Sequence, residues 1–412
     1  MEFGTGRQPY RRRAGSQAAI LRAIYHFGPV KRSQLSEYLG LTMPTITTNI
    51  NDMIARGIVR ETGLAASRGS SGRRARPVDI VPGARHFIGV EMQGSRWAVC
   101  LLDFRGNALF AESGDSPHQG YDENMQAVCR MIRRAASACG LALEQVAGIG
   151  ICTPGLVNRA EGILDMRVSP SWTGKNIRQD IAAQTGYTGP VSVENNACAR
   201  AYGVQIFQRE LLAGGRSLAY LFISDGIACP LVPVTDDFVG SVVGMGELGH
   251  SIMDPKGPLC RCGNRGCLEA YSSDWAVTSR CAQALEEGKA PVLRRLCGGR
   301  RPTMDAILEA QAGGDGGVRE IIREAVYMLG LAAVNVSNFA GPSLMNIDGK
   351  LFQSEENRAE LAEVVRKNLC GVIRSRTELV FAEPDRLSGA KGVAALAIFR
   401  DLEAHGTGRS AL

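Results

Sequence analysis

The stretch Gly246–Glu269, GELGHSIMDPKGPLCRCGNRGCLE, is the most informative segment of this chain of 412 residues. Cys260, Cys262 and Cys267 lie within eight residues, with glycines between them that permit the tight turns of a tetrahedral metal site. His250 is the only histidine close to them in sequence. Three thiolates and one imidazole suit Zn²⁺, so the segment predicts a closed Cys3His site. The alternatives are a redox pair or three buried thiols.

The composition is that of a globular protein with two or three domains. Hydrophobic residues make up 45% and charged residues 21% of the chain. No run approaches the ~18 uninterrupted apolar residues that cross a bilayer, and residues 1–13 lack the apolar segment of a secretory signal. The nine cysteines outside the cluster are scattered singly, which indicates buried thiols in a reducing compartment. We therefore expect a cytoplasmic protein with no membrane partner.

Positive charge is concentrated at the start of the chain. Residues 1–82 contain 13 Lys/Arg and 5 Asp/Glu, a net charge of +8, whereas the remaining residues contain 34 and 36, a net charge of −2. A basic module on a nearly neutral body indicates a polyanionic partner for that module alone. The alternative is a solvated basic tail.

Short helices are predicted within this basic module. Residues 17–27 place apolar side chains on one helical face, and Gly28-Pro29 ends the helix. Ser33 is expected to cap a second helix that ends at Gly40. A third helix begins after Thr42, with Pro44 in its first turn. Three helices with a tight turn between the second and third predict a helix-turn-helix.

Two strands and a basic loop complete this module. Residues 58–60 and 77–80 predict a hairpin with Arg68, Arg73, Arg74 and Arg76 near its tip, which suits a wing on a phosphate backbone. The alternative is a three-helix protein-interaction domain. In a winged helix the third helix enters the major groove with its N-terminal residues leading. The expected DNA-binding residues are Thr42, Pro44, Thr45, Thr47, Thr48, Asn51, Arg73 and Arg74.

Strands and helices alternate from Phe87 onward, which predicts an α/β body. Strands are expected at 87–92, 96–103, 146–152, 190–194, 217–224, 227–233, 343–347 and 379–381. Three strands followed by a helix open this body, and a similar pattern starts again near residue 217. The repetition indicates two similar lobes.

Several segments together resemble the ROK family of repressors, open reading frames and sugar kinases. The resemblance is most specific over Gly246–Glu269 and extends over nearly the whole chain. Four more segments resemble family motifs in order, namely Val146–Gly155, Pro170–Trp172, Val193–Ala197 and Gly389–Ala394. The winged helix at the N-terminus is what the repressor branch of this family carries.

The resemblance implies a two-lobed body like that of actin and the sugar kinases, a ribonuclease H-like fold. It predicts a winged helix at 1–82, a first lobe at 83–194 completed by 385–412, and a second lobe at 195–384. It also implies a sugar site and a structural zinc ion. The implied sugar ligands are Asn195, Asn196, Glu247, His250 and Glu269, and the implied zinc ligands are His250, Cys260, Cys262 and Cys267. Carboxylates and amides suit the several hydroxyls of a sugar, and His250 can use one ring nitrogen for each task.

The residues that phosphoryl transfer requires depart from the family pattern. Asn196 stands where the family has its catalytic Asp, and an amide cannot accept the proton. The first phosphate-binding turn reads Glu91-Met92-Gln93-Gly94-Ser95, one glycine short, and the second reads Ser224-Asp225-Gly226, with a negative charge near the phosphates. We therefore expect a sensor that has lost kinase activity.

The resulting hypothesis is a DNA-binding regulator, a repressor of carbohydrate genes, that a sugar controls. Its partners would be a double-stranded DNA operator and a sugar effector, and two-fold operators favour a homodimer or homotetramer. The alternatives are an ATP-dependent sugar kinase with a DNA-binding arm, a constitutive DNA binder with a vestigial pocket, and a body that senses a partner protein.

Overall fold

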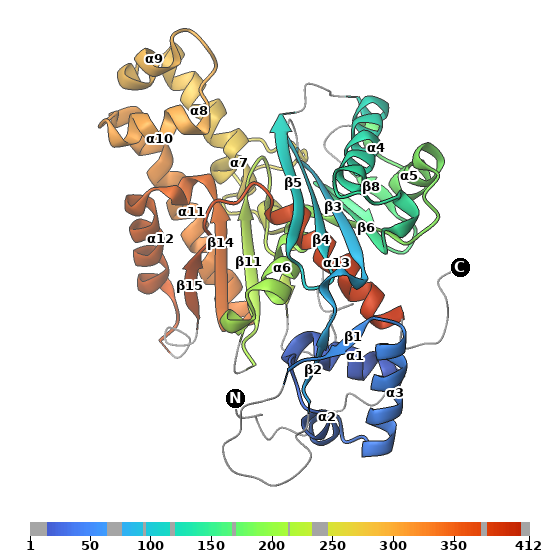
Figure 1. Ribbon diagram of the computed structural model, residues 1–412. Helices are drawn as coiled ribbons and strands as arrows, with labels where there is room; N and C mark the ends of the chain where they lie inside the picture. Colours follow the sequence, from blue (N-terminus) through green and yellow to red (C-terminus); the bar gives the residue numbers. More distant parts are fainter. Residues whose placement is uncertain are drawn as a thin grey trace. The chain divides into compact units, whose positions relative to one another are not determined.

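The computed structural model in Figure 1 describes residues 15–63, 76–93, 96–115, 120–166, 170–212, 215–232, 246–371 and 377–404. The chain forms two compact units, which we call unit 1 (residues 1–207 and 387–412) and unit 2 (residues 208–386). Among the described residues, no helix is long and apolar enough to cross a membrane. The three domain ranges expected from the sequence stay predictions.

Unit 1 begins with the expected helices. They are α1 (Ser16–Phe27), α2 (Arg32–Leu39) and α3 (Met43–Ala55). The side chain of Thr42 caps α3, because its oxygen accepts a hydrogen bond from the backbone N–H of Thr45 at 3.4 Å. Gly40 ends α2 in the left-handed conformation, with a φ of 63°. These two residues fix the turn between α2 and α3.

The start of α2 differs from the expectation. Ser33 is not the cap, because the helix already begins at Arg32. Instead, the side-chain oxygen of Gln34 accepts a hydrogen bond from the backbone N–H of Lys31 at 3.0 Å. The longer amide side chain reaches back to a donor that the helix leaves unpaired.

The hairpin of the winged helix is also present. β1 (Val59–Glu61) and β2 (Val78–Ile80) are antiparallel, with Val59 opposite Ile80. The side chains of Ile20, Ile46 and Ile50 are fully buried. Residues 64–75 of the connection between the strands, with Arg68, Arg73 and Arg74 of the expected wing, lie outside the described residues.

A five-stranded sheet forms the rest of the unit 1 core, in the order β10-β6-β3-β4-β5. Its strands are β3 (His86–Gln93), β4 (Arg96–Asp103), β5 (Ala108–Asp115), β6 (Gly148–Thr153) and β10 (Val191–Asn195). β6 lies parallel to β3 and to β10, while β4 is antiparallel to both β3 and β5. A sheet with parallel strands and with helices between them confirms the predicted α/β body.

Helices cover both faces of this sheet. They are α4 (Tyr121–Ala138), α6 (Asn196–Phe207) and α13 (Ser388–Ala404). Ile88 and Val90 pack in one core cluster with Met125 of α4. Because side chains alternate along a strand, Gly89 faces the opposite side, where a Cβ would lie 1.9 Å from the carbonyl oxygen of Ala390 in α13. The C-terminal helix therefore packs with its backbone against the sheet.

Smaller elements complete unit 1. A three-stranded sheet contains β7 (Leu156–Asn158), β8 (Ile163–Met166) and β9 (Lys175–Asn176), and α5 (Ile177–Thr185) follows it. Among the described residues, the 3-10 helices of unit 1 are η1 (Pro82–Ala84), η2 (Leu143–Gln145) and η3 (Pro170–Trp172), and those of unit 2 are η4 (Arg209–Leu212), η5 (Leu248–His250) and η6 (Lys350–Gln353).

Unit 2 contains a second five-stranded sheet, in the order β12-β11-β14-β15, with β13 also paired with β11. Its strands are β11 (Leu218–Ile223), β12 (Ile227–Ala228), β13 (Leu231–Val232), β14 (Leu344–Gly349) and β15 (Glu378–Phe381). β11, β14 and β15 are parallel, and β12 and β13 both pair antiparallel with β11. The second expected strand is thus split around Pro230, since proline cannot donate to a ladder. Residues 233–245, which follow it, lie outside the described part.

The helices of unit 2 pack with its sheet in one hydrophobic core and are labelled in Figure 1. They are α7 (Glu269–Ser272), α8 (Asp274–Glu286), α9 (Pro291–Cys297), α10 (Met304–Ala312), α11 (Gly316–Ala340) and α12 (Glu355–Asn368). The long helix α11 packs against α7, α8 and α12. The short helix α7 begins at Glu269, directly after the cysteine cluster, so this packing ties the cluster to the core of unit 2.

Candidate metal centre and effector site

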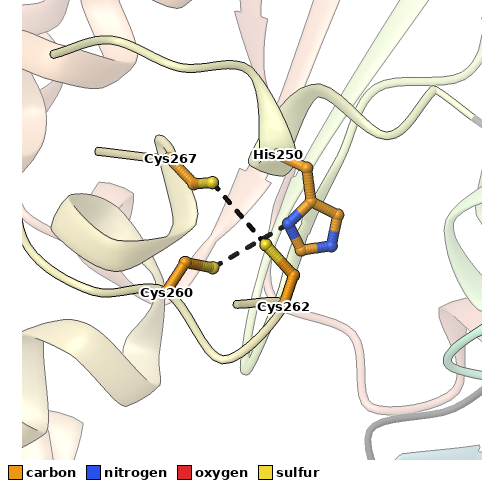
Figure 2. A group of neighbouring side chains, drawn as sticks. All are labelled: His250, Cys260, Cys262 and Cys267. Atoms are coloured by element: carbon orange, nitrogen blue, oxygen red, sulfur yellow. Dashed lines mark hydrogen bonds between the residues drawn. The ribbon is translucent and has the colours of Figure 1, made fainter. Parts of the chain in front are cut away.

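The four residues predicted to bind zinc lie together in unit 2. The ligand atoms of His250, Cys260, Cys262 and Cys267 are all within 4.8 Å of one another. Figure 2 shows the four side chains gathered around one point. Cys260 Sγ lies 3.9 Å from His250 Nδ1, and Cys262 Sγ lies 3.7 Å from Cys267 Sγ. An ion with Zn–S bonds of roughly 2.3 Å holds tetrahedral ligand atoms about 3.7 Å apart. The donor set and its spacing therefore fit zinc.

Backbone geometry explains how so few residues surround one point. The backbone N–H of Cys260 donates to Asn264 at 2.8 Å, which closes a tight turn around Cys262. Gly266 adopts a φ of 71°, and a Cβ there would lie 1.5 Å from the carbonyl oxygen of Asp254. Only glycine fits this position. The glycine that precedes Cys267 is thus required by the fold of the loop.

The thiols differ in acidity. Burial raises the pKa of Cys267 to about 12 and also raises the pKa of Cys260. For Cys262 burial acts in the same direction, but a hydrogen bond from the backbone N–H of Asn264 opposes it, and the resulting pKa is lowered. A thiol binds metal as the thiolate, so a bound cation would displace protons from Cys260 and Cys267.

The carboxylates predicted to bind sugar lie beside this centre. Glu247 Oε2 is 3.9 Å from His250 Nε2, the ring nitrogen that faces away from the cysteines. Burial raises the pKa of Glu247, His250 lowers it and the nearby charge of Glu269 raises it, although 41% of the Glu247 side chain is exposed. Glu269 itself is buried at the start of α7. Unit 2 thus brings Glu247, His250 and Glu269 together.

The two asparagines predicted to bind sugar lie in unit 1, where β10 meets α6. Both are buried. Asn195 Nδ2 donates to the carbonyl of Gly155 at 3.0 Å, and its Oδ1 accepts a hydrogen bond from the N–H of Ala197 at 2.8 Å. Asn196 Oδ1 accepts from the same N–H at 3.0 Å. Both amides therefore help to cap α6, a structural task that the sequence did not reveal.

An ion pair occupies the region of the first expected phosphate turn. The carboxylate of Glu91 accepts two hydrogen bonds from Arg200 Nη2, at 2.8 and 3.0 Å, and both side chains are buried. A Cβ on Gly389, near the start of α13, would lie 2.2 Å from Glu91 Cδ. The Glu91 carboxylate thus fills the space in front of this helix. Arg200 was missed, although a single arginine among small apolar residues of α6 indicated a buried partner.

The expected DNA-contacting helix has a mixed surface. Thr42, Pro44, Thr48 and Asn51 are exposed, whereas Thr45 and Thr47 are partly buried. These exposures suit contacts with a groove, and the DNA-binding role of each residue stays a prediction. Arg73 and Arg74 lie outside the described residues.

Arginines also connect the winged helix with the rest of unit 1. Arg105, at the turn after β4, donates to the carbonyl of Tyr25 in α1 at 2.7 Å and forms an ion pair with Asp79 in β2. Arg22 of α1 forms a second ion pair, with Glu403 of α13, at 3.8 Å. None of these residues was singled out from the sequence, because the contacts join positions far apart in the chain.

Comparisons with known proteins agree with this arrangement. The sequence profile of the ROK family matches residues 87–400, and that of the MarR family matches residues 13–68. The xylose repressor of Bacillus spizizenii is 26% identical over 342 residues, which cover 82% of this chain and 83% of that protein. The DNA-binding transcriptional dual regulator NagC of Escherichia coli is 25% identical over 349 residues, with coverage of 83% and 82%.

Solved structures support the same fold. A ROK family transcriptional regulator, described as a homologue of the E. coli MLC protein, superposes with a TM-score of 0.78 at 24% identity and covers 95% of this chain and 97% of its own. A ROK family glucokinase from Streptomyces griseus superposes with a TM-score of 0.63 at 24% identity, over 76% of this chain and 98% of its own. The first likeness extends over the winged helix as well as the body. This chain therefore belongs to the ROK family and carries a MarR-type winged helix at its N-terminus.

Proposed function

We propose that this protein is a sequence-specific DNA-binding transcriptional regulator whose affinity for DNA is controlled by a sugar or sugar derivative. The observation that carries this proposal is the combination of a winged helix with a ROK body that keeps Glu247, His250 and Glu269 together. The names of the xylose repressor and NagC favour a repressor of carbohydrate genes. The protein would act in the cytoplasm on double-stranded DNA, as a homodimer or homotetramer.

In this proposal the sugar hydroxyls are bound by Asn195, Asn196, Glu247, His250 and Glu269. Zn²⁺ is a structural ion held by His250 and the three cysteines, and when bound it fixes the ring of His250. The sugar lowers DNA affinity by binding more tightly to the state that cannot bind DNA. The DNA contacts come from α3, through Thr42, Pro44, Thr45, Thr47, Thr48 and Asn51, and from Arg73 and Arg74.

Loss of kinase activity is part of the same proposal. Asn196 cannot act as a general base, and the buried pair of Glu91 with Arg200 takes the space before α13. The likeness to a glucokinase in complex with AMPPNP makes an active ATP-dependent sugar kinase the second candidate. ATP consumption with any sugar of a panel would support that candidate.

DNA binding itself is tested by fluorescence anisotropy with DNA from upstream of the protein's own gene, titrated at several salt concentrations. We expect tight binding that weakens steeply with salt, because phosphate contacts release counterions. If neither this DNA nor a selection from random sequences yields a bound site, the proposed function is wrong.

A further inference from the structure

Arg261 stands in the sequence between Cys260 and Cys262, two of the candidate zinc ligands. Arg261 Nη1 donates to Asp225 Oδ2 at 3.0 Å, and Nη2 donates to the backbone carbonyl of Asp225 at 2.5 Å. Nη2 also lies 3.5 Å from Glu269 Oε1. One guanidinium thus contacts both the turn after β11 and the Glu269 carboxylate of the candidate sugar site.

An aromatic ring holds the same guanidinium from another side. Arg261 Cζ lies 4.5 Å from the ring centroid of Trp275 in α8, a distance at which a cation is attracted to the ring face. Only 22% of the Arg261 side chain is exposed. Because the guanidinium is planar and its donors point in fixed directions, the ring and the two acceptors on Asp225 determine its orientation.

The turn held by Arg261 lies directly against Glu269. A Cβ on Gly226 would be 3.0 Å from Glu269 Oε2, and the backbone carbonyl of Ser224 accepts a hydrogen bond from the N–H of Asp274 at 2.7 Å. Loss of the Arg261 side chain would therefore remove one support from the turn and one from the carboxylate of Glu269. Asp225, which the sequence suggested only as a repulsive charge, is paired with Arg261.

The backbone of Arg261 depends on its two neighbours. Cys260 and Cys262 would both be fixed by a bound zinc ion, so the position of the Arg261 backbone follows from metal binding. We propose that Arg261 is a positioning residue that couples the metal centre to Glu269 and to the turn at residues 224–226. Its effect on sugar binding rests on the proposed function, since it assumes that Glu269 binds the sugar.

The coupling is testable with Zn²⁺ alone. The chain has three tryptophans, so the part of the fluorescence that disappears in Trp275→Phe belongs to Trp275. We expect that removing zinc from the full chain with a chelator, and returning it, changes Trp275 emission reversibly. In Arg261→Ala this response should be lost while zinc still binds one to one. Arg265→Ala, an exposed arginine of the same loop, is the matched control and should respond like the wild type.

Two results would overturn the proposal. One is a wild-type Trp275 signal that does not respond to zinc, and the other is an unchanged response in Arg261→Ala. If Arg261→Ala fails to fold, Arg261→Lys serves instead. It keeps the charge but loses the planar fork, and we expect it to lose most of the response.

A second measurement examines the sugar. Binding of D-xylose and N-acetyl-D-glucosamine to the zinc-loaded protein is followed by calorimetry. We expect Arg261→Ala to weaken any binding about 10–100-fold, the range expected when a hydrogen bond to a charged group is lost. Equal affinity in wild type and variant would contradict the proposal. If neither sugar binds the wild type, the choice of sugar in the proposed function fails, whereas the Trp275 measurement still decides the role of Arg261.

Discussion

The buried pair of Glu91 with Arg200 allows a quantitative prediction. The two side chains are only 3% and 6% exposed, so Arg200→Ala leaves a carboxylate with neither water nor its partner. Removing one member of a buried ion pair lowers the free energy of unfolding by about 3–5 kcal/mol.

We therefore expect Arg200→Ala to destabilise unit 1 by about 4 kcal/mol at pH 7, which corresponds to a fall in Tm of roughly 8–16 °C for a unit of this size. Urea unfolding in a Trp275→Phe background measures this loss, since Trp97 and Trp172 both lie in unit 1.

Two controls complete the experiment. Arg134→Ala removes an exposed ion pair with Glu112 in the same unit and should cost less than about 1 kcal/mol. The double variant Glu91→Met/Arg200→Met should recover most of the stability, because an apolar pair can replace a buried ion pair. Our account of the pair is wrong if Arg200→Ala lowers the free energy of unfolding no more than Arg134→Ala does. It is also wrong if the double variant loses as much stability as the two single substitutions, Glu91→Met and Arg200→Met, lose together.

Three further predictions concern the metal, the DNA and the contacts between the winged helix and the rest of unit 1. Cys267→Ser should lower zinc affinity by at least tenfold in a competition with a chromogenic chelator, because zinc prefers thiolate in such a site; unchanged affinity would exclude Cys267 as a ligand. Thr48→Ala and Asn51→Ala should each weaken operator binding by about 1–3 kcal/mol in anisotropy titrations and leave non-specific binding unchanged, as expected for contacts to bases. Arg105→Ala should lower the Tm of the winged helix in calorimetry, because it removes contacts with α1 and β2, and an unchanged Tm would show that these contacts contribute little.

Local sequence patterns predicted much of the fold. Gly40 and Thr42 act within one turn of the backbone, so their roles follow from residue type and spacing. The zinc ligands were predicted for the same reason, since three of the four lie within eight residues. The structure places their ligand atoms together. Ser33 was misassigned because Gln34, one residue further on, competes for the same end of α2.

The remaining parts of the site depend on contacts between distant residues. Glu91 and Arg200 are 109 positions apart, and Arg261 and Asp225 are 36 apart. No periodicity or spacing links such pairs, because they meet only after β3 packs with α6 and α13, or after the cysteine loop folds onto unit 2. The sequence indicated altered phosphate turns but not the arginines that pair with their carboxylates.

The central claim is that a sugar bound by the ROK body releases the winged helix from DNA. It is tested most directly by anisotropy of the protein on its operator, with and without D-xylose, N-acetyl-D-glucosamine and a wider panel of sugars. We predict that one sugar weakens DNA binding, and that Glu247→Ala and Glu269→Ala each abolish this effect while DNA binding without sugar is kept. A wild-type protein whose DNA affinity no sugar alters, or variants that respond like the wild type, would contradict the account.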